Sequence, residues 1–206
     1  MDRGAERRET WVNDGDEASL AFARSRGFEI VSREIGLELE LASASLQEPA
    51  PSDGIELVCL ADRPELAEGM YEVAGEAIRD VPGSEEYVMF PREEFVQRHL
   101  HRPHGLAEGT FVALAGDEVV GYAKLRSAGA RPGVAVNGLT AVKRAWRGRG
   151  IAGALKQTQV AWAAGAGYER LVTGVEERNE PIRRLNERLG YRPAPGRITL
   201  RAPVST

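Results

Sequence analysis

The clearest change of pattern along the chain lies between Val134 and Tyr168. The segment Val134–Val142 is rich in β-branched and apolar residues, and this composition predicts a buried strand. Beyond a glycine-containing turn, apolar residues recur at helical spacing, which predicts a helix over Ile151–Ala164. The positions that define the predicted apolar face are Ile151, Ala154, Leu155, Thr158, Ala161 and Trp162.

The turn between this strand and this helix predicts an anion-binding site. Free backbone N–H groups gather where a helix begins, and a residue without a Cβ lets an anion approach them closely. The charges agree, because no Asp or Glu lies between Val119 and Tyr168, although the chain holds 31 acidic residues against 27 Lys plus Arg. This pattern favours a small polyanion over nucleic acid, which would require a basic domain. The alternative is a helix cap beside a solvated basic face.

The remaining apolar runs and turn residues predict further elements on both sides of this stretch. The predicted strands are Phe28–Arg33, Gly36–Ala42, Ile55–Leu60, Thr110–Ala115, Val119–Leu125, Arg170–Val175, Tyr191–Arg192 and Arg197–Ala202. The predicted helices are Asp16–Arg26, a helix that starts at Pro64 and includes Ile78, Arg92–His101 and Glu180–Leu189.

Three sequence motifs in this order resemble those of the GNAT superfamily of acyl-CoA-dependent N-acyltransferases. The turn reads Arg147-x-x-Gly150-x-Ala152, the strand before it contains Gly138-Leu139-Thr140-Ala141-Val142, and the run Asn179–Tyr191 is similar to the one that closes many members. The resemblance covers about residues 55–203. It implies an α/β (α+β) fold in which helices flank a mixed, mostly antiparallel sheet, with a V-shaped splay between two central parallel strands.

The resemblance also implies acetyl-CoA as co-substrate and a set of residues that hold it. These are Leu139, Thr140, Ala141, Val142, Arg147, Gly148, Arg149, Gly150, Ile151, Ala152, Gly153, Asn179 and Asn186. The backbone N–H of Val142 is the candidate oxyanion donor, because a fixed donor helps most where negative charge develops. We expect Arg147 and Arg149 to add charge rather than to fix geometry.

Two positions depart from the family pattern. Asn186 stands where a tyrosine more usually serves as general acid, and an amide cannot donate a proton in that role. We therefore expect Asn186 to hydrogen-bond the sulfur or the pantetheine arm only. Val175 replaces the asparagine of the common T-x-N signature that begins at Thr173. Neither departure excludes activity, because a thiolate can depart without a dedicated acid.

The residues leave the general base unidentified. All three histidines (His99, His101 and His104) lie in one stretch near Glu93 and Glu94, and Glu85, Glu86 and Tyr87 are equal candidates. A polar loop with surface histidines is the favoured interpretation of this stretch. Pro103 interrupts the helical spacing of His101 and His104, so we expect no metal site.

The favoured function is transfer of an acetyl group from acetyl-CoA to a primary amine of a small molecule by direct attack. The alternatives are a non-catalytic CoA-binding or regulatory module and a protein acetyltransferase. No nucleic acid or membrane partner is expected. The charged start of the chain is unlike a signal peptide, and the single cysteine, Cys59, suits a buried thiol, so we expect a cytoplasmic protein.

An internal repeat links the two ends of the chain. Gly27 aligns with Gly190 at an offset of 163 residues (190 − 27), and the same offset pairs Thr10 with Thr173 and Leu37 with Leu200. The alternative is two unrelated helix–strand–strand pieces. We interpret residues 1–48 as a partial GNAT module, 49–54 as a linker and 55–206 as a complete module, as in a mycothiol synthase-like tandem protein. We expect residues 1–48 to dock on the second module, or to exchange between two chains and form a homodimer.

Overall fold

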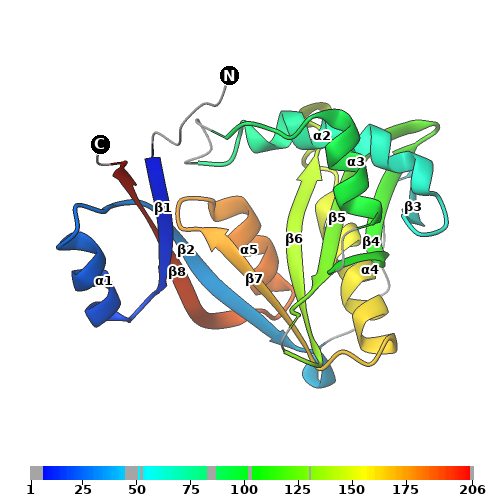
Figure 1. Ribbon diagram of the computed structural model, residues 1–206. Coiled ribbons are helices and arrows are strands. Elements are labelled where there is room, and N and C mark those ends of the chain that lie inside the picture. Colours follow the sequence, from blue (N-terminus) through cyan, green and yellow to red (C-terminus); the bar gives the residue numbers. More distant parts are fainter. Residues whose placement is uncertain are drawn as a thin grey trace.

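The protein forms one eight-stranded sheet (Figure 1). The computed structural model describes residues 7–44, 51, 53–82, 87–101, 104–129 and 131–204. The strands are β1 (Arg7–Asn13), β2 (Glu29–Glu40), β3 (Ile55–Cys59), β4 (Gly105–Ala115), β5 (Glu118–Ser127), β6 (Val134–Val142), β7 (Arg170–Glu176) and β8 (Arg192–Pro203). Their order in the sheet is β1-β8-β2-β7-β6-β5-β4-β3, and every neighbouring pair is antiparallel except β6 and β7. The expected mixed, mostly antiparallel sheet is therefore confirmed.

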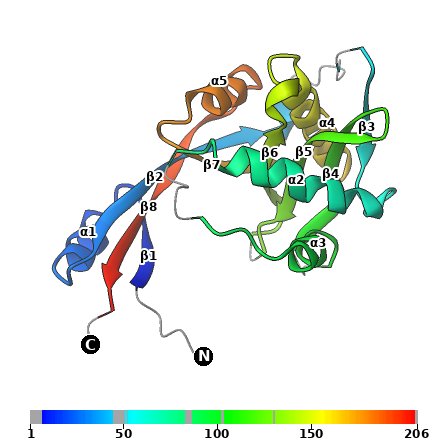
Figure 2. The same cartoon turned by 90° about the horizontal axis from the view of Figure 1, so that it is seen from above.

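Helices cover both faces of the sheet, as Figure 2 shows from above. They are α1 (Glu17–Arg24), α2 (Ala67–Ile78), α3 (Arg92–Leu100), α4 (Ile151–Gly165) and α5 (Glu180–Arg188). Residues of β4 separate the two layers by alternation: Val112 packs in the core with α2 and α3, whereas Ala113 packs with α4. None of these helices in the described part of the chain is long and apolar enough to cross a bilayer.

The two parallel strands separate soon after they meet. Residues Val134–Val136 of β6 pair with Arg170–Val172 of β7, and the pairing ends there. On its other side β6 remains paired with β5 as far as Val142. The edge of β6 from Asn137 to Val142 is therefore open toward β7, which confirms the V-shaped splay.

Two strand predictions at the ends of the chain were wrong in the same way. The predicted pairs Phe28–Arg33 with Gly36–Ala42, and Tyr191–Arg192 with Arg197–Ala202, are each one long strand, β2 and β8. Register shifts in the β2–β8 pairing absorb the irregular residues of β8. Gly36 makes the close approach possible, because a Cβ there would lie 2.1 Å from the Pro195 carbonyl oxygen.

The first strand, β1, was not predicted as an element, but the internal repeat places it. Strands β1 and β2 have the bounds of β7 and β8 less 163 residues, and α1 starts 163 residues before α5. The pairing is reciprocal, since β2 lies between β7 and β8 while β8 lies between β1 and β2. Glu34 pairs with Arg197, its own equivalent at this offset, and their side chains form an ion pair of 2.8 Å. The two ends of the chain are thus related by an approximate two-fold axis.

Residues 7–44 dock on the rest of their own chain as part of its sheet. Leu37, Leu39 and Leu41 are buried in one core cluster with Leu171 of β7 and Val160 of α4. A homodimer through this segment stays a prediction, as does its origin as a remnant of a first module. Cys59, expected to be buried, is half-buried, and its Sγ donates to the carbonyl oxygen of Glu108 at 3.4 Å.

Candidate active site

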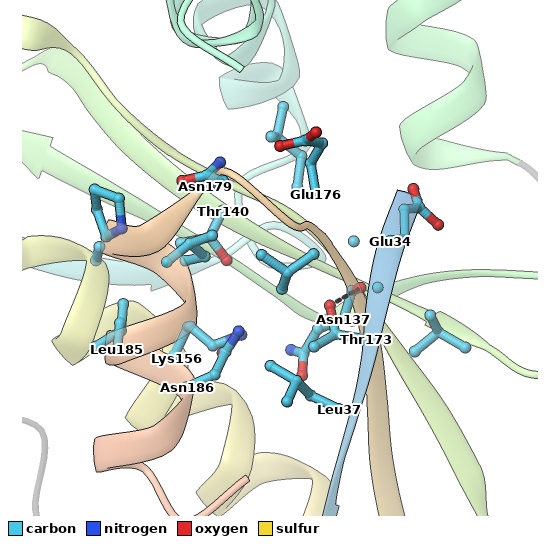
Figure 3. A pocket seen from close by; sticks show the side chains of 18 of the residues that line it. Glu34, Leu37, Asn137, Thr140, Lys156, Thr173, Glu176, Asn179, Leu185 and Asn186 are labelled. Carbon is cyan, nitrogen blue, oxygen red and sulfur yellow. Dashed lines mark hydrogen bonds between the residues drawn. The ribbon is translucent and has the colours of Figure 1, made fainter. Parts of the chain in front are cut away.

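A cleft of about 1270 Å³ opens where β6 and β7 separate (Figure 3). Its walls come from β6, β7, the start of α4 and the inner face of α5, and also from β2 and β8. The N-terminal segment therefore contributes to the site through β2. Of the predicted CoA-binding residues, the following line the cleft: Leu139, Thr140, Ala141, Val142, Arg147, Gly148, Gly150, Ile151, Ala152, Gly153, Asn179 and Asn186. Arg149 does not; it stacks over Trp146, with its guanidinium carbon 4.5 Å from the ring centroid.

The glycine turn holds the start of α4 open to the cleft. Gly148 and Gly150 each have a φ of 76°, a left-handed conformation that favours glycine. Gly150 is the N-cap of α4, and no side chain caps the helix there. The first N–H groups of α4 and the positive end of its dipole are therefore left for an anion, as the sequence predicted.

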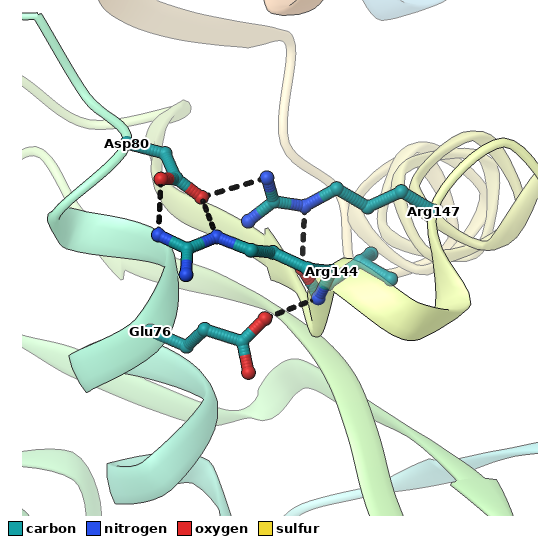
Figure 4. Close-up of polar contacts among 5 residues, drawn as sticks. Glu76, Asp80, Arg144 and Arg147 are labelled. Carbon is teal, nitrogen blue, oxygen red and sulfur yellow. Dashed lines mark hydrogen bonds and ion pairs between the residues drawn. The ribbon is translucent and has the colours of Figure 1, made fainter.

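Arg147 fixes the geometry of the turn, contrary to our expectation. Its Nε donates to the Val142 carbonyl oxygen at 2.9 Å, and its Nη1 lies 2.7 Å from an Asp80 carboxylate oxygen (Figure 4). Arg144 also binds Asp80, and its backbone N–H donates to the Glu76 carboxylate. The two guanidinium groups hold the pKa of Asp80 below its usual range. These contacts join α2 to the end of β6.

The open edge of β6 presents backbone groups to the cleft. The Lys143 N–H donates to the Val120 carbonyl oxygen on β5. Because N–H groups alternate in direction along a strand, the N–H of Val142 points away from β5, toward the splay. The Val142 carbonyl points the same way, since Arg147 reaches it. The candidate oxyanion donor therefore lies on the open edge.

A buried polar network closes the narrow end of the splay. The Asn137 amide donates to the Gln159 side-chain oxygen at 2.9 Å, and Gln159 donates to the Gly109 carbonyl oxygen at 3.1 Å. The Tyr191 hydroxyl donates to the Asn137 side-chain oxygen, and the Thr173 hydroxyl donates to the Asn137 backbone carbonyl at 3.2 Å. Every polar atom of the Asn137 amide side chain that these bonds involve is held in place, so this end of the cleft is rigid.

Two further polar side chains are buried beside this network. Lys156 of α4 is 2% exposed and Asn186 of α5 is 1% exposed, and both line the cleft (Figure 3). Burial lowers the pKa of Lys156 to about 7. Its Nζ lies 5.2 Å from the centroid of the Tyr191 ring. The sequence missed Lys156 as a site residue, although it stands among the apolar positions of a predicted buried helix.

The face of α4 that packs on the sheet was also predicted in part wrongly. Ala161, expected to be apolar core, is exposed, and Thr158 is only half-buried, whereas Lys156 and Gln159 are buried. The helix is rotated relative to the prediction because two polar residues occupy inward positions. An apolar periodicity cannot reveal this, since it scores Lys and Gln as outward-facing.

The histidines and their neighbours do not line the cleft. His99 is buried in the core, its Nδ1 is 2.8 Å from the Phe95 carbonyl oxygen, and burial lowers its pKa to about 4. His101 and His104 are exposed, and Tyr87 lines a different hollow. Glu93 and Glu94 are exposed residues of α3 outside the cleft, and Glu85 and Glu86 lie outside the described residues. Among the ranges that the structure describes, no group of three or more His, Cys, Asp and Glu is placed to hold a metal ion.

Sequence reasoning missed three carboxylates that do line the cleft, namely Glu34, Glu38 and Glu176. Glu34 lies opposite Glu176 across the β2–β7 pair, and Glu38 lies opposite Val172. By alternation these residues face away from Leu37 and Leu39, which pack in the core with Val160 and Ala163 of α4. They came to the site through long-range strand pairing, for which the local sequence carries no signal.

Comparison with known proteins supports this description. A sheet that opens between two parallel strands beside a glycine turn is the fold of the GNAT acyltransferases, and 286 chains of solved structures match this one. The model of the acetyltransferase (GNAT) family matches residues 75–191, more than half of the chain. The protein therefore belongs to the acetyltransferase (GNAT) family. A search of curated proteins gives no match.

The similar solved structures are longer than this chain. A GCN5-related N-acetyltransferase from Sphaerobacter thermophilus has a TM-score of 0.74 at 22% identity, over 97% of this chain and 60% of that one. A tandem GNAT protein from the clavulanic acid biosynthesis pathway has a TM-score of 0.71 at 20% identity, over 98% of this chain and 65% of that one. At these identities the likeness concerns the fold. The chain spans less than two thirds of the length of either protein.

Proposed function

We propose that the protein transfers an acetyl group from acetyl-CoA to a primary amine of a small molecule by direct attack. The observation that carries this proposal is the open edge of β6 from Asn137 to Val142 beside the uncapped start of α4. The first feature suits an extended arm with amide groups, and the second suits a pyrophosphate. Both features lie in one cleft, as acyl-CoA requires.

The thioester would then lie beside backbone donors of β6. The N–H of Val142 is our candidate to stabilise the negative charge that develops on the thioester oxygen during attack. Asn179 and Asn186 would contact the arm from α5, and both line the cleft. The carboxylates support an amine as the acceptor, because they attract a cation to the face of the sheet opposite α4. Glu38 is the leading candidate, since no ion pair to another described residue occupies it, whereas Arg197 binds Glu34 and Arg178 binds Glu176.

We predict that Gly150→Asp lowers acetyl-CoA affinity at least tenfold, measured by calorimetry. The substitution places a carboxylate at the anion site, and a loss of about 1.4 kcal/mol is already tenfold. The matched control is Gly167→Asp: Gly167 has a φ of 81°, a Cβ there would meet nothing within 4 Å, and it lies outside the cleft. Equal affinities of the Gly150 variant and the parent would show that the site is placed wrongly.

Thiol release from acetyl-CoA with a panel of small amines then separates the proposed function from its alternatives. Release with at least one amine supports the enzyme. Binding of acetyl-CoA without release under any amine would favour a non-catalytic CoA-binding or regulatory module, and release only with peptides would favour a protein acetyltransferase. A mycothiol synthase-like tandem architecture, a homodimer and a cytoplasmic location remain predictions.

A further inference from the structure

Lys156 and Asn186 are the two buried polar groups of the cleft that the fold leaves without hydrogen-bond partners. Both side-chain atoms of Asn186 that can hydrogen-bond are buried and unpaired. Lys156 forms no ion pair or hydrogen bond with any other described residue; its contact is the face of the Tyr191 ring. Burying such groups unpaired costs free energy, so their presence at the cleft indicates a ligand that satisfies them.

The internal repeat provides a comparison within the molecule. The residue equivalent to Asn186 at the offset of 163 is Ala23 of α1, which is 6% exposed. It packs in an apolar cluster with Leu200, the equivalent of Leu37. A buried apolar residue therefore suits this helix position where no cleft adjoins it. The amide of Asn186 is not needed for packing, and it occurs in the copy of the helix that borders the cleft.

The surroundings of Lys156 specify the chemistry of the ligand group. Its Nζ is held over an aromatic ring whose hydroxyl is fixed by Asn137, at the narrow end of the splay. A cation in a dry site interacts most strongly with a negative charge. If acetyl-CoA occupies the cleft as proposed above, its phosphates lie at the start of α4, and negative charge appears deeper in the cleft only at the reacting thioester.

We propose that Lys156 is the proton donor to the thiolate that leaves acetyl-CoA, and that Asn186 hydrogen-bonds the same end of the arm. The amine nitrogen forms a bond to the thioester carbon, and the bond between this carbon and the sulfur breaks with its electron pair on the sulfur. One proton passes from the Lys156 ammonium to the sulfur. The amine gives up one proton to solvent, and neutral Lys156 regains one from solvent, so the products are the amide and CoA thiol.

This assignment supplies the group that Asn186 cannot replace. An amide has no proton to give, whereas an ammonium does. The pKa of about 7 makes Lys156 a stronger acid than an alkyl thiol, whose pKa is about 8.5 in cysteine, so the transfer to the thiolate is downhill. The inference rests on the proposed function, because it places CoA in the cleft.

The test measures the pKa of the CoA thiol when it is bound to the full chain, by ultraviolet absorbance of the thiolate. Desulfo-CoA, which lacks the sulfur, provides the baseline. A cation within about 4 to 6 Å lowers a thiol pKa by roughly one to three units, so we expect a reduction of that size in the wild-type protein. In Lys156→Met the thiol pKa should return to within about half a unit of its value in free CoA.

Lys143→Met is the matched control, because it also removes one lysine charge. Lys143 follows β6, pairs with Glu118 at 2.7 Å and lies outside the cleft. This variant should keep the lowered thiol pKa. An unchanged thiol pKa in the wild-type complex overturns the inference whether or not any variant folds. So does an equal reduction in Lys156→Met, or a loss in that variant that affects only succinyl-CoA binding, which would assign Lys156 to an acyl carboxylate.

The two proposals fail in different ways. If CoA does not bind the wild-type protein, the proposed function fails. If CoA binds, and Gly150→Asp weakens it, but the thiol pKa does not depend on Lys156, the proposed function stands and only the role of Lys156 is lost.

Discussion

At the scale of single residues, Lys156 is held in a charge state that folding disfavours. Its pKa falls from 10.5 to about 7 because burial removes water from the ammonium. Each unit of this shift corresponds to about 1.4 kcal/mol, so the penalty on the charged form is roughly 5 kcal/mol. The fold therefore bears a cost at this position that the cleft, rather than the core, explains.

We predict that Lys156→Met increases the free energy of unfolding, and that the increase depends on pH. Between pH 7 and 10.5 the unfolded chain keeps a proton that the folded protein has released, so wild-type stability rises across this window. The variant lacks this rise. Urea unfolding in the absence of CoA should show a gain of several kcal/mol below pH 7 that shrinks toward pH 10.5.

The shape of the pH dependence is the decisive part of this result. A gain that stays constant across the window would show that the methionine acts by packing alone, and that Lys156 is not held uncharged by burial. Circular dichroism spectra of the two proteins should coincide, because a buried apolar side chain of similar length fits the site.

At the scale of elements, the site depends on two long strands that cross at close range. Gly36 of β2 and Gly196 of β8 lie at this crossing, where a Cβ on either one would come 2.1 Å from a carbonyl oxygen of the other strand. Glu34 and Arg197 meet at the same place. Because β2 carries Glu34 and Glu38 to the cleft, the spacing of this pair sets where the carboxylates stand.

We predict that Gly36→Ala lowers the free energy of unfolding by at least about 2 kcal/mol, because a backbone oxygen cannot move aside as a flexible side chain can. Thermal unfolding measures this loss. The control is Gly165→Ala at the end of α4, where a Cβ meets nothing within 4 Å and alanine favours the helix by about 0.5 to 1 kcal/mol. Wild-type stability in the Gly36 variant would mean that β2 and β8 are not packed this closely.

At the scale of the whole molecule, the first segment is an internal part of the sheet. Strand β2 is the partner of both β7 and β8, and its leucines belong to the same core cluster as α4 and β7. Strand β7 also forms one side of the splay. The N-terminal segment therefore supports the cleft as well as lining it.

We predict that a chain without residues 1–48 loses its cooperative thermal transition and its affinity for acetyl-CoA. The deletion removes Leu37, Leu39 and Leu41 from the core, and truncating one buried leucine costs about 2 to 5 kcal/mol. Their sum is comparable with the roughly 5 to 15 kcal/mol that stabilises a typical protein. Calorimetry and gel filtration measure the outcome.

The control is the full chain cut at a protease site introduced into residues 49–54. Its two fragments should stay together, because the sheet and not the connection joins them. A deletion variant that melts and binds like the full chain would make the segment a passenger, whereas a concentration-dependent dimer of the full chain would support exchange between chains.

The sequence by itself determined the elements around the cofactor site. Strand β6, the turn at Gly148 and Gly150, and helix α4 are contiguous, so their apolar pattern and glycines act through local backbone geometry. The repeat at an offset of 163 also predicted that the two ends of the chain share a structure, because similar local sequences form similar elements. The family followed from the same contiguous motifs.

Only the tertiary structure decided what surrounds these elements. Strand pairing between residues more than a hundred positions apart brought Glu34 and Glu38 to the cleft, and it joined β2 and β8 across prolines that locally predict a break. The packing of α4 against the sheet turned Lys156 inward, to the side that also receives Asn186. Burial, charge state and the lack of partners are properties of these three-dimensional neighbours, and a pattern along the chain does not contain them.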